Sequence, residues 1–347
     1  MSQPPSLHDY GTRAKPPDSR PISPVVVALT GCHGAIGRTL LPRLVRLPEI
    51  ARVLCLDIEP PALAEGSDVA SKLAYVNVDL TAADATSTVA SALKSHQVAT
   101  LVHLAFRQGP SPYPGRSHEL ESVGSMRLAQ ACLESKVRKI LLWSRTWLYG
   151  ARADAPSVLD EQAPTNARRT ERFLADKIDA ERDILSFRAP GRGRTATILR
   201  MAPIVCPGSS SHITNLLMSR GVPSILGFDP MVQLLHVDDA VEAILLALFR
   251  DGPPIVNVTS AGAVPLSYAR RTLGTRPLVL PRSMATAMTS ALWLSGKGQL
   301  PPSMLDYIQY SCVADDRLAG SVLSYHPSHN ASSILEQARA DAQRSAK

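Results

Sequence analysis

Long apolar runs are missing from this sequence. The longest apolar tracts, such as Ala240 to Phe249, are too short or too interrupted to cross a bilayer, so no membrane span and no membrane partner are predicted. The first residues, Met1 to Pro24, are rich in Pro and Ser and lack the apolar core that a secretory signal requires. We therefore expect a flexible leader over residues 1–24 rather than a targeting helix.

Cysteine is scarce, and its spacing excludes two kinds of covalent framework. The chain has five cysteines, an odd number, with wide spacing and no CxxC pair. Reduced, buried thiols in a cytoplasmic protein explain this usage better than disulfides or a zinc site, and no metal ligands are predicted. The five residues are Cys32, Cys55, Cys132, Cys206 and Cys312.

Aromatic residues make up only 5% of the chain, which leaves few rings for stacking on nucleobases. The formal net charge is +7, and basic clusters lie at residues 168–172 and 188–200. Solvated surface explains such clusters, and no nucleic-acid motif accompanies them. We expect no nucleic-acid partner.

The composition is that of a folded chain with a sizeable core. Of its 347 residues, 45% are hydrophobic and 19% are charged. This length is enough for one large α/β domain, or for a domain with an attached lobe. Disorder as the main state is excluded by the same numbers.

A glycine-rich turn stands near the start of the chain. Residues 30–37, which read TGCHGAIG, directly follow the apolar run Val25 to Leu29 and lead into apolar residues at helical spacing. Glycine lets such a turn be tight and lets backbone N–H groups approach a pyrophosphate at the positive end of a helix. A second apolar strand ends in Asp57, twenty residues after Gly37, where a carboxylate suits the hydroxyls of an adenosine ribose. The pattern favours a dinucleotide site over a plain structural turn.

Strands and helices alternate along the chain, which predicts a Rossmann-type α/β fold with a doubly wound parallel sheet and a smaller C-terminal substrate lobe. Pro42 is expected to kink or break the first helix, and Asp238 to cap the helix that ends at Arg250. Strands are expected at 25–29, 53–56, 73–78, 100–104, 139–143, 196–200 and 255–259, and further helices at 84–95 and 119–135. The expected domains are the leader 1–24, the core 25–205 with 232–260 returning to it, and the lobe 206–347.

Several motifs together resemble the extended short-chain dehydrogenases/reductases, in particular the NAD-dependent epimerase/dehydratase family. The resemblance runs from about Val25 to beyond Thr259, and it rests on the order and spacing of the motifs. They are the glycine turn at 30–37, Asp57, Val78-Asp79-Leu80, His103-Leu104-Ala105, Leu148-Tyr149-Gly150, Asp176-Lys177, Leu199-Arg200 and His236-Val237-Asp238-Asp239.

The resemblance implies that this chain binds NAD. Asp57 favours NAD over NADP, because a carboxylate repels a 2′-phosphate. His33 is expected to contact phosphate or solvent, and for Asp79 a strand-end turn residue is the alternative. From the pyrophosphate through ribose and adenine to the nicotinamide side, the implied cofactor residues are Gly31, His33, Gly34, Ala35, Ile36, Gly37, Asp57, Asp79, Leu80, Leu104 and Ala105, with Lys177 at the nicotinamide ribose.

The catalytic half of the family pattern has changed. In that family a Tyr-x-x-x-Lys pair and a Ser or Thr exchange a proton with the substrate while hydride moves to or from nicotinamide. Here Lys177 is present, but Phe173 replaces the tyrosine and Arg145 replaces the hydroxyl residue. The remaining catalytic candidates are Lys177, Ser144 and Thr146. The hydroxyls of Ser144 and Thr146 flank Arg145, and either could substitute for the family's Ser or Thr only if the strand end is bulged or shifted.

Other side chains carry weaker predictions. His212 is a further candidate for proton transfer, whereas His236 is interpreted as a packed or capping histidine. Tyr149 belongs to the structural Tyr-Gly corner of the resembled family, and Glu121 stands where that family often has Asn. For Lys177, an exposed helical lysine paired with a neighbouring carboxylate is the alternative.

Three functions stay open from the sequence. The first is an atypical NAD-dependent oxidoreductase or epimerase that acts on an unidentified hydroxyl or carbonyl substrate, and we favour it because the lobe after residue 261 could form a small-molecule pocket. The second is a non-catalytic NAD-binding sensor or scaffold, and the third is an interaction fold that has lost the nucleotide. A homodimer is usual in the resembled family. The aromatic residues of the lobe, which could equally be core, are Tyr268, Trp293, Tyr307 and Tyr310.

Overall fold

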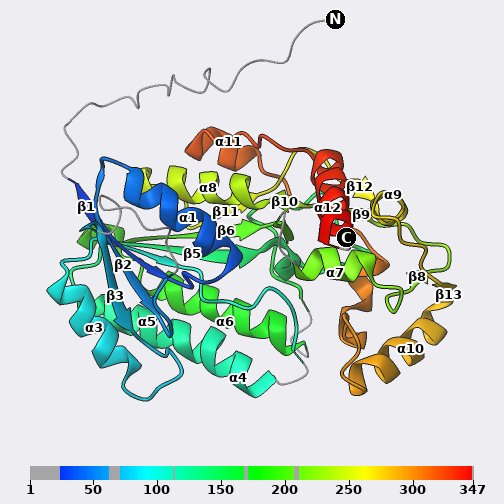
Figure 1. The fold of residues 1–347 in the computed structure, drawn as a ribbon, viewed down its shortest axis with the longest axis horizontal. Coiled ribbons are helices and arrows are strands. Elements are labelled where there is room, and N and C mark those ends of the chain that lie inside the picture. Colours follow the sequence, from blue (N-terminus) through cyan, green and yellow to red (C-terminus); the bar gives the residue numbers. More distant parts are fainter. Residues whose placement is uncertain (1–23, 62–70, 112–113, 168–170, 207–210, 346–347) are drawn as a thin grey trace, which may run out of the picture.

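A seven-stranded parallel sheet forms the centre of the molecule, as the sequence predicts (Figure 1). The computed structural model describes residues 24–61, 71–111, 114–167, 171–206 and 211–345. Along the sheet the strand order is β11-β6-β5-β4-β1-β2-β3, so the chain reverses direction across the sheet between β1 and β4. The strands are β1 (Val25–Thr30), β2 (Ile50–Asp57), β3 (Leu73–Asn77), β4 (Thr100–His103), β5 (Lys139–Arg145), β6 (Thr195–Met201) and β11 (Ile255–Val258).

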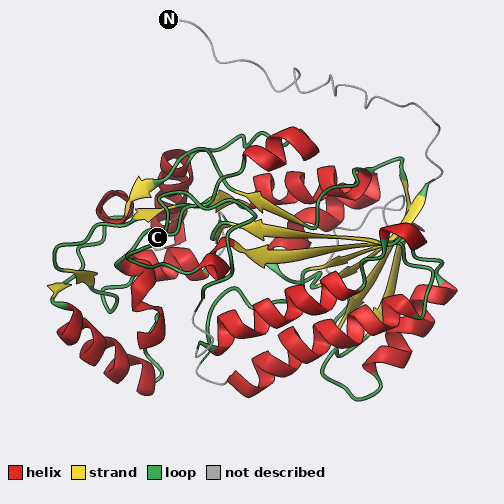
Figure 2. Ribbon diagram, turned by 180° about the vertical axis from the view of Figure 1, so that it is seen from behind, coloured by secondary structure: helices red, strands yellow, loops and turns green. Residues whose placement is uncertain are grey.

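Helices cover both faces of this sheet (Figure 2). One face carries α1 (Ala35–Arg46) and α8 (Val237–Phe249), with α11 (Arg317–Leu323) beside them (Figure 1). The other face carries α3 (Ala85–Ser95), α5 (Gly124–Leu133) and α6 (Arg172–Ser186). The fold is therefore the doubly wound architecture, in which ligands bind at the carboxyl ends of the strands.

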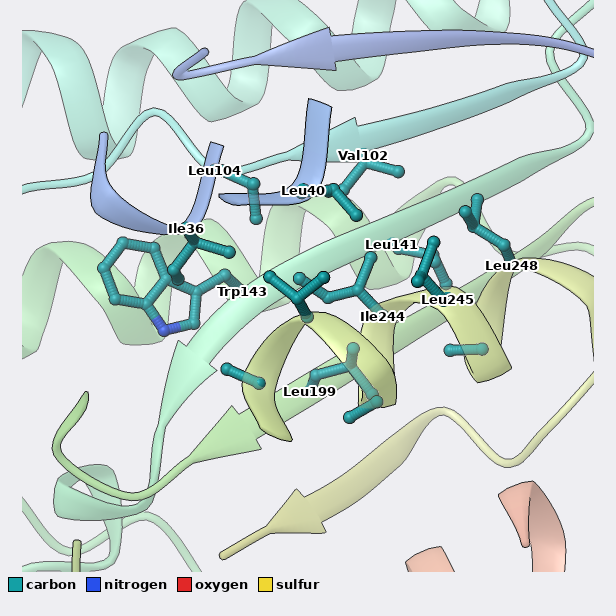
Figure 3. Packing of buried hydrophobic residues seen from close by; sticks show 14 of the residues in the cluster. Ile36, Leu40, Val102, Leu104, Leu141, Trp143, Leu199, Ile244, Leu245 and Leu248 are labelled. Atoms are coloured by element: carbon teal, nitrogen blue, oxygen red, sulfur yellow. The ribbon is translucent and has the colours of Figure 1, made fainter. Parts of the chain in front are cut away.

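Two apolar clusters lie on the two faces because successive strand residues point to opposite sides. On β5, Leu141 and Trp143 belong to the cluster under α1 and α8, whereas Ile140 and Leu142 belong to the other. Figure 3 shows the first cluster, with Ile36 and Trp143 at its end near the carboxyl ends of the strands. The same alternation decides to which face of the sheet each β5 side chain points.

The first helix differs from its prediction. α1 continues through Pro42 for a further turn, to Arg46, so the predicted early break does not occur. Proline removes one backbone hydrogen bond there, but Leu40, Leu41 and Leu44 are buried in the core and stabilise the helix. Packing outweighs local propensity at this position.

The predicted helix over 119–135 is divided. It begins as α4 (Pro114–His118), passes through one π turn, η1 (Glu119–Val123), and continues as α5. A π turn inserts an extra residue into the helix and often marks a functional site. Here it carries Glu121, a buried carboxylate.

The cap of α8 also differs from its prediction. His236, not Asp238, is the N-cap, and its Nδ1 accepts the Asp238 N–H at 3.1 Å. The interpretation of His236 as a capping histidine is confirmed. Asp238 instead pairs with Arg43 of α1.

The C-terminal part adds short strands and helices around a third apolar cluster, which also contains Leu148, Phe173 and Leu174. This part therefore packs against the carboxyl end of β5 and the start of α6. Its elements are β7 (Ile204–Val205), α7 (His212–Met218), β8 (Ser224–Ile225), β9 (Met231–Val232), β10 (Leu235–His236), β12 (Val264–Pro265), α9 (Leu266–Thr272), β13 (Val279–Leu280), α10 (Arg282–Leu294), η4 (Pro302–Ile308) and α12 (Ala331–Ser345).

Two predictions fall on undescribed parts of the chain. Residues 1–23 of the expected leader and the basic residues 168–170 lie outside the described ranges. Within those ranges, no helix has the length and apolar character needed to cross a membrane.

Candidate functional site

The glycine turn brings the end of β1 against the end of β4. Gly31 has φ of 73°, and a Cβ at this position would lie 2.6 Å from the carbonyl carbon of Leu104. His103 also ties the strands together, because its Nδ1 lies 2.7 Å from Thr30 Oγ1. Only glycine combines this backbone conformation with so close an approach. Gly31 and Leu104, both predicted cofactor residues, therefore lie in direct contact.

The start of α1 packs onto the same turn. A Cβ at Gly37 would lie 2.2 Å from the Gly31 carbonyl oxygen, and the Gly34 N–H donates to that oxygen at 3.1 Å. Gly34 is the N-cap of α1, and the Arg38 N–H donates to its carbonyl oxygen at 2.9 Å. The turn and the helix are thus one compact unit.

The N-terminus of α1 is open to an anion. No side chain caps it, and its first turn contains no acidic residue. The first N–H groups of a helix have no partner within the helix, and the helix dipole adds positive potential there. Glycine, alanine and isoleucine in this turn place no polar side chain in front of those groups. The open N-terminus of α1 therefore fits a pyrophosphate.

Asp57, at the end of β2, has one free oxygen. Its Oδ1 accepts the Ile58 N–H at 2.8 Å. Its Oδ2 is buried and, within the described chain, has no hydrogen-bond partner; His33 Nδ1, also buried and without a partner, lies 3.5 Å away. An unpartnered buried acceptor fits a ribose hydroxyl donor. His33 therefore lies beside the predicted ribose position.

Asp79 and Leu80 follow β3. Asp79 Oδ1 accepts from both the N–H and the Oγ1 of Thr81, at 2.9 and 2.7 Å, and these bonds hold the pKa of Asp79 below its ordinary value. This is the geometry of a strand-end turn residue, the alternative that the sequence left open. Leu80 is buried against Gly124 of α5. Contact of either residue with adenine stays a prediction.

Lys177 of α6 is buried and paired with a carboxylate. Its Nζ lies 3.0 Å from Glu121 Oε2, and neither side chain is more than 2% exposed. Glu121 Oε1 accepts the Arg107 N–H at 2.7 Å. Burial lowers the pKa of Lys177 to about 8, although the Glu121 carboxylate opposes this shift. The alternative of an exposed helical lysine is wrong.

Arg145, the last residue of β5, is a second buried cation. Its Nη2 donates to the Arg107 carbonyl at 2.7 Å, and its guanidinium carbon lies 4.9 Å from the Trp143 ring centre and 5.0 Å from that of Phe173. Burial lowers the pKa of Arg145 to about 10, so it stays charged at neutral pH. Its Nε has no partner among the described residues. A cation held between two rings therefore occupies the position that the sequence resemblance assigns to the family hydroxyl.

Aromatic rings enclose both cations. The Lys177 ammonium lies 4.3 Å from the ring centre of Phe106 and 5.1 Å from that of Phe173. The space beside Arg145, which Trp143 and Trp147 also line, measures about 10 Å³. It holds one water at most.

The two hydroxyl candidates differ in their contacts, and a catalytic role of Thr146 stays a prediction. Ser144 points to the opposite side of β5 from Arg145, and its Oγ donates to Glu181 Oε1 at 2.5 Å. Glu181 also accepts two hydrogen bonds from Arg200, at 3.0 and 2.6 Å. Thr146 is fully buried, and its Oγ1 has no partner in the described chain.

Of the other polar candidates, His212 lines the same small space as Arg145, whereas Tyr149 contacts Asn257. Burial lowers the pKa of His212 to about 4, so this side chain is neutral at pH 7. The Tyr149 hydroxyl donates to Asn257 Oδ1 at 2.7 Å, which agrees with its interpretation as a structural residue. Tyr307 stacks on Trp147, with ring centres 4.9 Å apart.

Two cavities lie between the start of α6 and the C-terminal part of the chain. The smaller, of about 370 Å³, is lined by Phe173, Asp176 and Trp293. The larger, of about 460 Å³, is lined by Tyr307 and Tyr310, among others. Three of the four lobe aromatics thus line cavities, whereas Tyr268 lies on the surface.

Comparison with known proteins agrees with this geometry. The family model described as the NAD dependent epimerase/dehydratase family matches residues 27–259, more than half of the chain. The chain belongs to the NAD-dependent epimerase/dehydratase family. An uncharacterized protein of Mycobacterium tuberculosis is 29% identical over 317 residues, which cover 88% of this chain and 81% of that protein.

Solved structures share the family fold. MoeE5 in complex with UDP-glucuronic acid and NAD is 24% identical with a TM-score of 0.67, and the match covers 92% of this chain and 99% of that one. The UDP-glucose 4-epimerase of Thermus thermophilus, a complex with NAD, is 20% identical with a TM-score of 0.66 and the same coverage. At these identities the likeness establishes the fold of this family member.

Sequence reasoning noticed Glu121 and Arg145 as departures from the family pattern but assigned them no contacts. It also missed Arg107, whose backbone N–H and carbonyl join the two residues. The one available signal was that an acidic and a basic residue replace two neutral residues of the same family site.

We predict that Glu121→Gln destabilises the protein by about 3–5 kcal/mol, because it leaves Lys177 buried without its carboxylate. The double variant Glu121→Gln/Lys177→Met should regain at least about 2 kcal/mol of this loss. Urea unfolding measures both changes, and Glu134→Gln, on the surface of α5, is the control with an expected change below about 0.5 kcal/mol. A single variant as stable as the wild type would show that the ion pair does not form.

Proposed function

We propose that this protein binds the ADP-ribose half of NAD or NADH and reports the redox state of the cofactor without turning it over. The observation that carries this proposal is the Arg145 guanidinium between Trp143 and Phe173. It puts a fixed positive charge where the family has a catalytic hydroxyl.

The features that favour cofactor binding are the open helix N-terminus, the two glycines that a Cβ would clash with, and the free oxygen of Asp57. The N–H groups at the start of α1 would hold the pyrophosphate, and Asp57 the adenosine ribose. A bound nicotinamide would supply a hydride acceptor or donor. NAD is preferred to NADP, because Asp57 would repel a 2′-phosphate.

Proton transfer lacks a donor at its usual position. Phe173 has no exchangeable proton, and Lys177 is held by Glu121. Loss of general acid–base catalysis typically costs about 10²- to 10⁴-fold in rate. The hydroxyl that orients substrate is also absent, because Arg145 occupies its place and Ser144 bonds to Glu181. The proposed site therefore binds the cofactor but lacks the side chains that usually take part in proton transfer.

The charges at the nicotinamide end of the site favour the reduced cofactor. Glu121, Lys177 and Arg145 together carry a net charge of about +1, and the nearby Asp176 contacts His118 at 2.7 Å. Oxidised nicotinamide is a cation, whereas the reduced ring is neutral. For charges roughly 6–8 Å apart and an effective dielectric constant of about 20, the repulsion is about 2–3 kcal/mol. A sensor requires in addition that the preferred redox form binds two conformations of the protein with different affinity, because only such a difference shifts a conformational equilibrium.

We predict that Asp57→Ala weakens NADH binding by about 10- to 150-fold, because it removes hydrogen bonds of a charged acceptor to the ribose. Isothermal titration calorimetry measures the affinity. Asp154→Ala, whose side chain is 81% exposed, is the control and should bind as the wild type does. Equal affinity of the Asp57 variant and the wild type would contradict the ribose assignment.

We predict that the wild type binds NADH about 30- to 100-fold more tightly than NAD⁺ and that Arg145→Ser reduces this ratio to about 3-fold or less. Calorimetry with both cofactors on both proteins gives the ratio. Similar affinities of the wild type for NADH and NAD⁺ would remove the sensor proposal.

The second candidate is an epimerase-like oxidoreductase in which Lys177 itself exchanges the proton. It is favoured by the fall in the pKa of Lys177 to about 8, near the working range of a general acid or base. The 370 Å³ cavity beside Phe173 would then hold the substrate. Because the neighbours named above are structures with UDP-glucuronic acid or of a UDP-glucose epimerase, a UDP-sugar is the first class to test.

An activity panel separates the two candidates. Under the sensor proposal, neither the wild type nor Phe173→Tyr forms NADH with UDP-sugars or simple alcohols. Under the oxidoreductase candidate, the wild type forms NADH slowly, and Phe173→Tyr raises the rate by about 10²-fold or more, because a phenol next to Lys177 restores the family acid. The absorbance of NADH follows net oxidation, and chromatography of the UDP-sugars follows epimerisation, which returns the hydride to the sugar and leaves no net NADH.

A further inference from the structure

The outward side of α10 carries an apolar stripe that nothing in the described chain covers. α10 lies at the outer edge of the C-terminal part, away from the sheet (Figure 1). Its buried residues are Ala285 and Thr289, which face inward. The exposed residues follow the spacing i, i+3, i+7 and i+10, which places them on one side of a helix. They are Met284, Ala287, Ala291 and Leu294.

The stripe is strongly exposed, and two further exposed apolar residues precede α10 in the chain. Met284 is 56% exposed and Leu294 87%. Leu278 and Val279, immediately before and at the start of β13, are 56% and 55% exposed. Single exposed apolar residues are common, but a contiguous group indicates a contact surface. We call these six residues the α10 face.

The surroundings of the α10 face are positively charged. The sequence from 252 to 305 contains no Asp or Glu but has five basic residues. Arg276 and Lys297 are exposed and lie two residues before Leu278 and three after Leu294. Arg220 borders the end of α10, because a Cβ on its neighbour Gly221 would lie 3.1 Å from Leu292.

These cations are available to a partner. Arg220, Arg276 and Lys297, with the nearby exposed Arg271, form no ion pair with any carboxylate in the described ranges. The partner that complements the α10 face is therefore apolar at its centre and negatively charged around it.

Although the sequence predicts no membrane partner, we propose that the α10 face docks on the surface of a membrane that contains anionic phospholipid. Interfacial helices bury apolar side chains at the level of the headgroups and place Lys and Arg among the phosphates. Met284 and Leu294 would enter the interface, while Arg276 and Lys297 contact the headgroups. The dinucleotide site lies at the strand ends and stays outside this contact.

Two other occupants fit less well. A second copy packed face to face would bring the unpaired cations of both copies together, which like-charge repulsion disfavours. The N-terminal residues 1–23 contain three basic residues and two acidic residues, so their net charge is positive, like that of the surroundings of the α10 face. An acidic protein surface is the remaining competitor, and the experiment includes it.

Cosedimentation with vesicles tests the proposal on the full-length protein. We predict binding to vesicles of phosphatidylcholine with phosphatidylglycerol, release at high salt, and no binding to phosphatidylcholine alone. Met284→Glu/Leu294→Glu should abolish binding, and Arg276→Gln/Lys297→Gln should weaken it about 30-fold. Met126→Glu, at a 51% exposed position of α5, is the control and should bind normally. Circular dichroism checks that each variant is folded.

Four results would overturn the proposal. They are no binding to the anionic vesicles, equal binding to both kinds of vesicle, anionic binding that Met284→Glu/Leu294→Glu leaves unchanged, and capture by immobilised poly-glutamate without vesicle binding. The last result would assign the α10 face to an acidic protein instead.

Discussion

The buried ion pair between Glu121 and Lys177 organises the nicotinamide end of the site. It joins the π turn before α5 to α6 at 3.0 Å, and the second oxygen of Glu121 holds the backbone of Arg107. The carbonyl of Arg107 in turn accepts from Arg145. A buried pair of this kind adds little net stability over an apolar pair, but its loss leaves a charge in the core. Its consequence is positional, because it fixes the loop after β4 and the end of β5 relative to each other.

The two halves of the site therefore differ in how closely they keep the family chemistry. The adenosine and pyrophosphate half depends on backbone conformation at Gly31, Gly34 and Gly37, and on one carboxylate, Asp57. The nicotinamide half depends on side chains, and there Phe173 and Arg145 have removed the proton donor and the hydroxyl. A protein with the first half and without the second binds a cofactor better than it transforms one. In the proposed function, the fixed charge on Arg145 would give this binding a preference for one redox state.

The fold was predictable because its signals are local and repeated. Each sheet strand is a short apolar run before a turn, and Gly31 in the turn at 30–37 combines positive φ with close backbone contact. Helix details were less predictable, because packing of Leu40 and Leu44 carries α1 past Pro42. In the site, the sequence indicated that Phe173 and Arg145 are anomalous. It could not indicate that Arg107 joins Glu121 to Arg145, because that link runs through backbone atoms.

The central claim is that cofactor affinity comes from the ADP-ribose half alone. Calorimetric titration of the wild type with ADP-ribose and with NAD⁺ tests it most directly. The account predicts that ADP-ribose binds at least as tightly as NAD⁺, because the nicotinamide cation adds repulsion from Arg145 and no favourable contact. Binding of NAD⁺ about tenfold or more tightly than ADP-ribose would contradict it, since that difference, about 1.4 kcal/mol, would mean that favourable contacts of the nicotinamide outweigh its repulsion from Arg145.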